Sequence, residues 1–249
     1  MVSNAMVILS KNNPLVKELL ALSDKKGRKE RGTFLLEGEK MVRECVNSPL
    51  EIVRMIVRED YAGDTFGYPV VTLGADAFCA VCDVKTPQGI AAEVKIPRFE
   101  TVSPKKSCLV LDGVSDPANV GAILRTAVAS GYEEVYCIGA ADPFSPKCVR
   151  ASMSAVFYAK IMQGTHEEVL NALKGVTVLA ADMGGENVFK FEAPEKFALV
   201  IGNEGQGLSS IMRERADSIV AIPMGEHTES LNAAVSAGIL MYQFKKNKE

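Results

Sequence analysis

Short apolar segments alternate with helical patterns through the second half of the chain, and this alternation constrains the fold more than any other feature. Strands are expected around Leu109 and at 135–138, 176–181, 197–201 and 219–222. Alternating strands and helices predict a mainly parallel sheet with helices on both faces. In open sheets of this kind, ligands bind at the carboxyl edge of the strands. We therefore expect an α/β domain with a ligand site at that edge.

A smaller alternation of strands and helices comes before it. Strands are expected at 34–37, 52–57, 70–73 and 89–94, and helices at 14–22, 39–46 and 75–81. Residues 97–107 carry Pro97 and Pro104 among charged residues and interrupt both periodicities, which is typical of a linker. The expected layout is a small α/β domain over 6–96, a linker over 97–107 and the larger domain over 108–249.

The bulk composition excludes several classes of protein. Of the 249 residues, 47% are hydrophobic and 24% are charged, which is typical of a soluble globular protein. No apolar stretch approaches the ~20 residues of a membrane span. The formal net charge of −3 argues against a surface coated in cations. Cys79 and Cys82 form a Cys-x-x-Cys pair, but no second pair completes a zinc site. We expect a cytoplasmic protein with reduced cysteines and no metal.

Three glycines within six positions follow the apolar run that ends at Ile201. They are Gly202, Gly205 and Gly207, with a carboxylate and two amides between them. Glycines let the backbone turn sharply and approach a ligand closely. The spacing does not match Gly-x-Gly-x-x-Gly, which disfavours a dinucleotide-binding dehydrogenase. Taken alone, the cluster is better explained by a tight loop that needs positive φ angles, and only its companion motifs favour a ligand site.

Two further segments join this glycine loop at the same expected edge. The first runs from Asp112 into a helix whose apolar face spans 120–128, with Asn119 in the preceding loop and Arg125 off that face. The second runs from Ile222 through Met224 to Ser230, where a second helix is expected to open. Three loops that converge at one edge predict a shared pocket.

These motifs resemble the three ordered motifs of the SpoU (TrmH) family of RNA ribose 2′-O-methyltransferases, of the SPOUT superfamily. The resemblance covers residues 108–244, and residues 32–44 resemble the substrate-binding domain that many members carry in front. It implies a trefoil-knotted α/β fold, a homodimer and S-adenosylmethionine as methyl donor. It also implies an RNA substrate, with ribosomal RNA favoured over transfer RNA, and chemistry that needs no metal.

The resemblance assigns roles to residues at the matching positions. The catalytic candidates are Arg125, Asn119, Glu204, Ser230 and Asn232. The cofactor-binding candidates are Leu199, Val200, Ile201, Gly202, Asn203, Gly207, Ile222, Met224, Ser230 and Leu231. The RNA-binding candidates form a basic cluster, Lys25, Lys26, Arg28, Lys29 and Arg31, because cations that neutralise phosphates generate most of the affinity for RNA.

Arg125 is the main catalytic candidate, although a guanidinium is a poor base. It stays protonated at neutral pH and has no acceptor. Its expected role is therefore to bind the phosphate beside the target ribose and to stabilise the developing alkoxide, while a phosphate oxygen or water takes the proton. The alternative is a surface ion pair with Asp112 or Asp116.

The other polar candidates also have structural alternatives. Asn119 either orients Arg125 or the target nucleotide, or caps a helix. Glu204 either fixes Arg125 or binds the substrate. Ser230 is the expected cap of the last helix, so Asn232 has less structural explanation.

Alternative functions remain open at the level of the sequence. One is a transfer RNA 2′-O-methyltransferase. A second is a catalytically silent RNA-binding protein with the same fold, and a third is a nucleotide-dependent enzyme of the doubly wound type. Binding of S-adenosylmethionine without methyl incorporation would favour the second, and saturable NAD or ATP binding the third.

Overall fold

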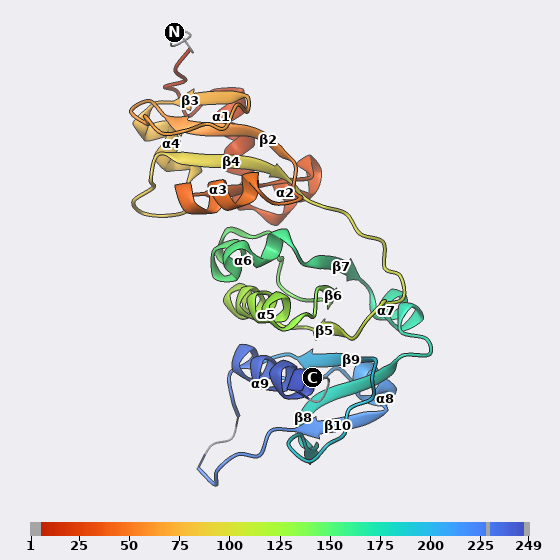
Figure 1. The fold of residues 1–249 in the computed structure, drawn as a ribbon. Helices are drawn as coiled ribbons and strands as arrows, with labels where there is room; N and C mark the ends of the chain where they lie inside the picture. The colour runs from red at the N-terminus through yellow and green to blue at the C-terminus, as the bar shows by residue number, and fades with distance from the viewer. Residues whose placement is uncertain (1–5, 228–229, 247–249) are drawn as a thin grey trace. The chain divides into compact units, whose positions relative to one another are not determined.

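The structure is a computed structural model that describes residues 6–227 and 230–246. The chain forms two compact units (Figure 1). The first runs to Pro97 and includes Phe144–Val149, and the second comprises Arg98–Pro143 and the chain from Arg150 onward. No helix in the described part of the chain is long and apolar enough to cross a membrane.

The first unit is built on a four-stranded sheet with the order β1-β4-β2-β3. Its strands are β1 (Thr33–Glu37), β2 (Ile52–Arg58), β3 (Val70–Leu73) and β4 (Ile90–Lys95), and its helices are α1 (Pro14–Leu20), α2 (Lys25–Arg31), α3 (Glu39–Val46) and α4 (Ala75–Val81). A 3₁₀ turn, η1 (Ala21–Ser23), joins α1 to α2. Helices α1 and α4 bury Val16, Leu19 and Phe78 against the sheet.

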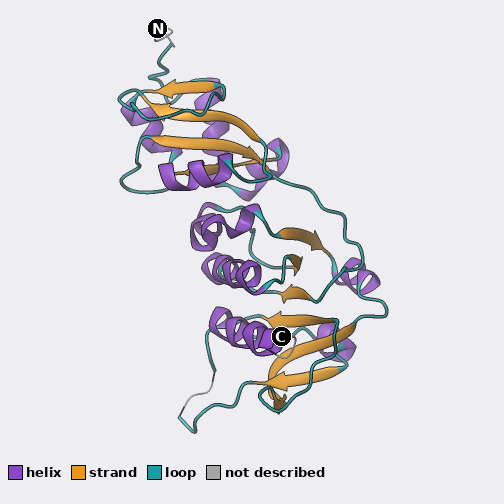
Figure 2. Cartoon of the chain, viewed as in Figure 1, coloured by secondary structure: helices purple, strands orange, loops and turns teal. Residues whose placement is uncertain are grey.

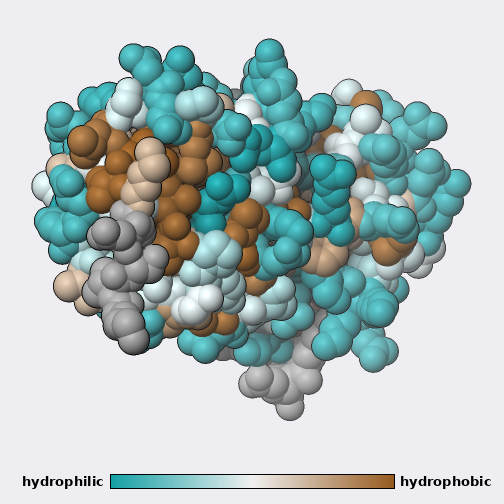
Figure 3. All heavy atoms as spheres, turned by 90° about the horizontal axis from the view of Figure 1, so that it is seen from above, coloured by the Kyte–Doolittle hydropathy of each residue, from teal (hydrophilic) through white to brown (hydrophobic). Residues whose placement is uncertain are grey.

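Figure 3 shows hydrophilic side chains over much of the face seen from above, interrupted by hydrophobic areas. The exposed apolar side chains of the first unit include Met6, Leu9 and Val70.

The second unit contains a six-stranded sheet with the order β10-β8-β9-β5-β6-β7, in which every pairing is parallel. The strands are β5 (Cys108–Asp112), β6 (Glu134–Ile138), β7 (Lys160–Gly164), β8 (Thr177–Asn187), β9 (Phe197–Gly202) and β10 (Ser218–Ala221). The helices are α5 (Pro117–Ser130), α7 (His166–Ala172), α8 (Ser210–Arg215) and α9 (Ala233–Lys246), with a 3₁₀ turn η2 (Met153–Phe157). Helix α6 (Pro146–Ser152) begins in the segment assigned to the first unit and ends in the second. Figure 2 shows the helices flanking the strands.

Alternate residues of the central strands bury against different helices. Val110 and Val200 form one core with Val169 of α7 and Met212 of α8. Their neighbours, such as Leu199, are equally buried and point to the opposite face of the sheet, because side chains alternate along a strand. The expected α/β class, a parallel sheet with helices on both faces, is confirmed. A knot in the path remains an expectation from the resemblance.

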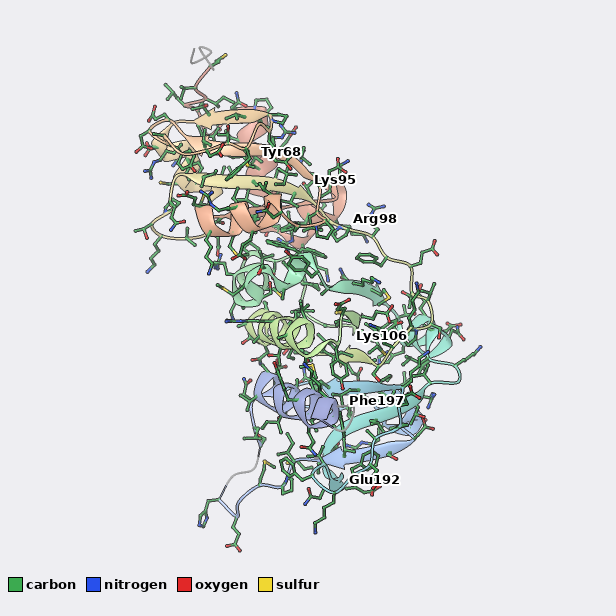
Figure 4. The ribbon with its side chains drawn as sticks, in the orientation of Figure 1. Tyr68, Lys95, Arg98, Lys106, Glu192 and Phe197 are labelled. Carbon is green, nitrogen blue, oxygen red and sulfur yellow. The ribbon has the colours of Figure 1, made fainter. Side chains whose placement is uncertain are left out.

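Helices α5 and α9 pack side by side and run in the same direction. Asn119, in the first turn of α5, is joined to Asn232, which directly precedes α9, and near the other ends of the two helices Ser130 Oγ donates to Met241 Sδ at 3.6 Å. The ring centroid of Phe244, near the end of α9, lies 5.2 Å from that of Phe197 at the start of β9. Figure 4 labels Phe197. Both helices therefore begin at the carboxyl edge of the sheet, where the site is expected.

Several elements differ from the sequence prediction. Residues 25–31 form helix α2 and residues 160–164 form strand β7, and neither element was predicted. Strand β8 continues to Asn187 rather than ending near 181. Helix α5 begins at Pro117, because Asp116 caps it by accepting from Ala118 N at 3.0 Å, so Asn119 lies within its first turn. Local periodicity misses such extensions because caps and sheet pairing, not apolar spacing, fix them.

Candidate active site

The loop after β9 is folded by the side chain of Asn203. Its Oδ1 accepts from Gly205 N and Gln206 N, both at 2.9 Å. Its backbone N–H and C=O pair with Gly207 at 2.8 and 3.0 Å. Its Nδ2 donates to the carbonyl of Gly113, beyond β5, at 2.7 Å. Asn203, expected to contact the cofactor, therefore holds the glycine loop in shape.

The three glycines of this loop have different roles. Only Gly207 has a positive φ, +72°. A Cβ on Gly202 would lie 2.6 Å from the carbonyl carbon of Gly207 and 2.7 Å from Leu208 N, so close backbone packing requires glycine there. At Gly205 the nearest atom to an added Cβ is Asn203 Oδ1 at 3.7 Å, which is ordinary contact.

Glu204 extends from this loop to the start of α5. Its carboxylate accepts from Ser115 N and Oγ, both at 3.0 Å, from Asp116 N at 3.2 Å and from Asn119 Nδ2 at 2.9 Å. Partial burial acts to raise the pKa of this carboxyl, but hydrogen bonds from Asn119 and from backbone N–H groups outweigh it, and the pKa falls to about 2. Glu204 is thus an anion at neutral pH, bound to α5 and not to Arg125.

Asn119 links Glu204 to the start of α9. While its Nδ2 donates to Glu204, its Oδ1 accepts from Asn232 Nδ2 at 2.9 Å. The Oδ1 of Asn232 in turn accepts from Ala234 N at 2.9 Å and Val235 N at 3.3 Å. Asn232, and not Ser230, therefore caps the last helix, which begins at Ala233. The prediction that the helix opens at Ser230 is wrong.

A second set of bonds fixes the far end of the glycine loop. Asp112, the last residue of β5 and only 3% exposed, accepts from Ser209 N at 2.7 Å. His166 Nε2 lies 3.1 Å from both Asp112 Oδ1 and Ser209 Oγ. A hydrolytic Ser-His-Asp arrangement needs the two partners on different ring nitrogens. Here Asp112 and Ser209 contact the same nitrogen of His166, so the cluster connects β5, α7 and the start of α8 and is not a hydrolytic triad.

A cavity of about 460 Å³ opens between the glycine loop and the segment that follows β10. Eight of the expected cofactor residues line it: Ile201, Gly202, Asn203, Gly207, Ile222, Met224, Ser230 and Leu231. Leu199 and Val200 do not, because they are fully buried inside β9. Their assignment is corrected to the core of the sheet.

The cavity also has walls that the sequence did not reveal. Asp182 and Met183 of β8 and Arg213 of α8 line it. The adjacency of β8 to β9 in the sheet brings the carboxyl end of β8 to the same edge as the glycine loop. Asp182 directly follows the predicted strand 176–181, so the strand-end rule applied to β9 and β10 could have found it.

Arg125 lies on an exposed face of α5, outside the lining of the cavity. It makes no hydrogen bond or ion pair with any residue that the structure describes, so the expected alternative of an ion pair with Asp112 or Asp116 is not observed. Asp112 instead contacts His166 and Ser209, and Asp116 caps α5. Within one chain the structure brings together Asn119, Glu204 and Asn232, but does not join Arg125 to them.

The basic cluster of α2 contains exposed side chains and side chains that are bonded to other parts of the protein. Lys25, Lys26 and Lys29 are exposed. Arg28 is 3% exposed, and its Nη1 donates to the carbonyls of Leu22 at 2.7 Å and Ser23 at 2.8 Å. The prediction that Arg28 contacts phosphate is therefore corrected, since its guanidinium satisfies the end of η1.

The fifth member of the cluster is held by carboxylates. Arg31 pairs with Glu18 at 2.9 Å and with the buried Glu93 at 3.5 Å. Arg54 also reaches Glu93, at 2.9 Å. Nearby, at the end of β4, Lys95 pairs with Glu51 at 2.6 Å (Figure 4). Arg31 is partly exposed, so it remains at the surface in a fixed position.

The cavity has the size and chemistry for a sulfonium donor with an adenosyl group. Sites for small cofactors occupy about 300–1,000 Å³, with mostly apolar walls and a few polar groups. Ile201, Ile222 and Leu231 supply apolar walls suited to adenine, and the glycine loop supplies backbone polar groups. No cluster of histidine, cysteine or carboxylate side chains in the described ranges could hold a metal ion.

Comparisons with known proteins agree with this geometry. Residues 106–242 match the SpoU rRNA Methylase family, and residues 13–92 match the MRM3-like substrate binding domain. RlmP of Bacillus subtilis, a 23S rRNA (guanosine(2553)-2′-O)-methyltransferase, is 34% identical over 96% of this chain and 98% of its own.

Solved structures give the same result. An AdoMet-bound rRNA methyltransferase from Sinorhizobium meliloti is 26% identical and superposes with a TM-score of 0.88 over 98% of each chain. An RNA 2′-O ribose methyltransferase is 27% identical, with a TM-score of 0.82 over 98% of this chain and 99% of that one. With a family match across more than half of its length and a full-length relative, this chain belongs to the SpoU family of rRNA methylases.

Proposed function

We propose that this protein transfers a methyl group from S-adenosylmethionine to the 2′-hydroxyl of a ribose in ribosomal RNA. The observation that carries the proposal is the hydrogen-bonded chain Glu204–Asn119–Asn232, which begins at Glu204 in the wall of a donor-sized cavity at the carboxyl edge of the sheet. Bound S-adenosylmethionine supplies an electrophilic methyl group on a sulfonium. The cavity residues hold that group, and the polar residues at its border orient the acceptor.

The cavity residues have distinct parts in this proposal. Gly202, Ile222 and Leu231 bind the adenosyl group through backbone groups and apolar contact. Ser230 is exposed at the border of the cavity and does not cap α9, so its hydroxyl is available to the acceptor nucleotide. Glu204 acts through Asn119, which it holds with one side-chain bond, and Asn119 and Asn232 fix the two helix starts beside the acceptor.

Arg125 acts in this proposal as a phosphate ligand beside the target ribose. Its exposed guanidinium has no partner among the described residues, and a guanidinium binds phosphate oxygens in a bidentate geometry. There it stabilises the developing 2′-alkoxide, while a phosphate oxygen or water takes the proton. Arg125 does not line the cavity of its own chain. We therefore propose that it acts at the cavity of a second copy of the chain in a homodimer.

An apolar surface on α9 supports the proposed homodimer. Val235 and Tyr242, seven residues apart on one face of α9, are 51% and 45% exposed. Large apolar side chains grouped on a surface commonly mark a contact between proteins. The first unit, with exposed lysines on α2, is proposed to hold the RNA, and the protein is proposed to work in the cytoplasm, where ribosomes are found.

The full-length similarity to RlmP narrows the proposed substrate to a guanosine of 23S rRNA. The test is to map 2′-O-methyl groups across all RNA from cells with and without the gene. The expected result is the loss of one site in 23S rRNA, restored by the wild-type gene but not by Arg125→Ala. Loss of a methylated site in transfer RNA would instead show that the substrate is transfer RNA and not ribosomal RNA. An unchanged map, together with measurable donor binding, would support a silent RNA-binding protein.

A further inference from the structure

One pair of oppositely charged side chains faces the cavity and has no role in the proposed function. Asp182 lies at the carboxyl edge beside the glycine loop, on β8, and Arg213 lies on α8. Arg213 Nη2 donates to Asp182 Oδ2 in an ion pair. The side chain of Asp182 is 20% exposed and that of Arg213 is 53% exposed, so both remain reachable from the cavity.

The remaining charged group of the cavity is already saturated. Among the described residues that line it, the charged ones are Asp182, Glu204 and Arg213. Glu204 accepts four hydrogen bonds from the start of α5. The ion pair, by contrast, uses one carboxylate oxygen and one terminal nitrogen. Oδ1 of Asp182 and Nη1 of Arg213 make no hydrogen bond with any other residue in the described part of the chain.

A charged pair of this kind complements a zwitterion. An α-amino acid carries an ammonium and a carboxylate a few ångströms apart, so it can place its ammonium on Asp182 and its carboxylate on Arg213. We propose that Asp182 and Arg213 bind the α-ammonium and α-carboxylate of the methionine moiety of S-adenosylmethionine. This inference rests on the proposed function, because it places the donor in this cavity.

The other parts of the donor fit this pair less well. A sulfonium would be attracted by Asp182 but repelled by the guanidinium beside it. The ribose hydroxyls and the adenine are neutral, so they can hydrogen-bond to a charged side chain but carry no pair of opposite charges to match Asp182 and Arg213, and adenine is matched by the apolar walls. The amino-acid end is the one part of the donor that uses both charges at once.

Three ligands distinguish these possibilities by direct binding. S-adenosylmethionine carries the sulfonium and the amino acid, S-adenosylhomocysteine keeps the amino acid but has a neutral sulfur, and 5′-methylthioadenosine keeps only the adenosine and a neutral sulfur. Dissociation constants are measured by calorimetry on the full chain, for wild type, Asp182→Asn and Arg213→Gln. Glu214→Gln is the matched control, because Glu214 is an exposed neighbour on α8 that does not line the cavity.

The expected result is selective for the amino-acid end of the ligand. Asp182→Asn and Arg213→Gln each weaken S-adenosylmethionine and S-adenosylhomocysteine by about 10- to 100-fold, the range for a lost charged hydrogen bond. Binding of 5′-methylthioadenosine stays within about twofold, as does binding of all three ligands to Glu214→Gln. Thermal melting of each variant confirms that it is folded, and 5′-methylthioadenosine reports an intact cavity.

The contrary outcomes each identify a different error. Equal loss for all three ligands would mean that the pair serves the ribose or the shape of the cavity. Loss confined to S-adenosylmethionine would mean that it serves the sulfonium. No loss in either variant would overturn the inference and leave the cavity assignment in place. If Gly202→Val, whose side chain would fill the loop, retained full donor binding, the cavity assignment itself would fail.

Discussion

Asn232 Nδ2 donates a hydrogen bond of 2.9 Å to Asn119 Oδ1, joining the N-cap of α9 to the first turn of α5 across 113 residues of sequence. Each asparagine uses both ends of its amide. Asn119 passes the connection on to Glu204, and Asn232 caps α9 with its own oxygen. A continuous chain of hydrogen bonds therefore leads from Glu204, in the wall of the cavity, to the start of α9, and a substitution at one of the three residues should alter the hydrogen bonding of the other two.

Substitution of Asn232 can separate helix capping from this bridge. Asp at 232 keeps the oxygen that caps α9, and an anion is favourable at a helix N-terminus, but it cannot donate to Asn119. We expect Asn232→Asp to keep the thermal stability while turnover falls at least about tenfold. Asn232→Ala loses the cap as well, at a cost of about 1 kcal/mol in the free energy of unfolding. Full activity of Asn232→Asp would show that the bridge has no catalytic importance.

Substitution of two glycines in the same loop is expected to affect donor binding differently. Gly202→Ala places a Cβ 2.6 Å from the backbone of Gly207, so the loop must shift and donor binding should fall by at least about tenfold. Gly205→Ala meets nothing closer than 3.7 Å, and Gly205 has no positive φ, so donor binding should stay within about twofold. Calorimetric titration with S-adenosylhomocysteine compares the two variants. Equal effects at both positions would contradict the packing role of Gly202.

The lowered pKa of Glu204 predicts how its contribution to stability depends on pH. Because the folded-state pKa of about 2 lies below the ordinary value of 4.5, the carboxylate stabilises the fold above about pH 4.5, and this contribution is lost as the pH falls toward 2. We expect the melting temperature of the wild type to exceed that of Glu204→Gln near pH 6, and the difference between the two to be smaller near pH 3.5. A difference that grows on acidification would contradict the hydrogen-bonded anion.

The same pKa constrains the pH profile of the reaction. Glu204 stays ionised throughout the pH range of ordinary assays, so it should add no acid limb above about pH 4. Glu204→Gln is therefore expected to lower the rate without moving the apparent pKa values of the profile. A limb near neutrality that disappears in this variant would assign a proton-transfer role to Glu204 instead.

The architecture could be predicted because the apolar patterns are strong. The strands at 70–73 and the helices at 39–46 and 75–81 match the observed β3, α3 and α4 residue for residue. A continuously apolar strand sequence such as that of β9 indicates that both faces of the strand are buried. The convergence of the loops after β9 and β10 on one cavity also followed, because parallel strands end at the same edge.

The side-chain partners could not be predicted because they depend on contacts distant in sequence. Asn232 appeared free at the sequence level, since Ser230 precedes it as an equally good cap. His166 had no partner in sequence and meets Asp112 and Ser209 only after β5, α7 and α8 are assembled. In the sequence Arg28 cannot be distinguished from the neighbouring lysines, but in helix α2 its side chain is buried.

The basic helix α2 predicts different effects for its exposed and buried cations. Replacement of Lys25, Lys26 and Lys29 by Ala removes up to three phosphate contacts, so RNA affinity should fall and its dependence on salt should become shallower by up to about 2 units of log–log slope. Donor binding should be unchanged. Arg28→Ala should instead lower thermal stability, because two carbonyls lose their donor. A salt dependence unchanged in the triple variant would remove α2 from the RNA interface.

Arg125 offers the sharpest test of the chemistry because it contributes nothing visible to the fold of its own chain. It is exposed and has no partner in the described ranges, so Arg125→Ala should change the free energy of unfolding by no more than about 0.5 kcal/mol. Turnover should nevertheless fall by about 10²–10³-fold, the cost of one lost donor to a developing oxyanion.

Arg125→Lys distinguishes the ways in which this side chain can act. It keeps the charge but loses the bidentate geometry, so it should retain only part of the activity. Single-turnover methylation with saturating donor and RNA, alongside thermal melting, measures both predictions. If Arg125→Lys kept nearly full turnover with an unchanged pH dependence, a bidentate phosphate ligand at this position would be ruled out. Mixing Arg125→Ala with Gly202→Val, each inactive alone, should restore part of the activity if the arginine serves the partner's cavity, because a mixed dimer then contains one intact pairing.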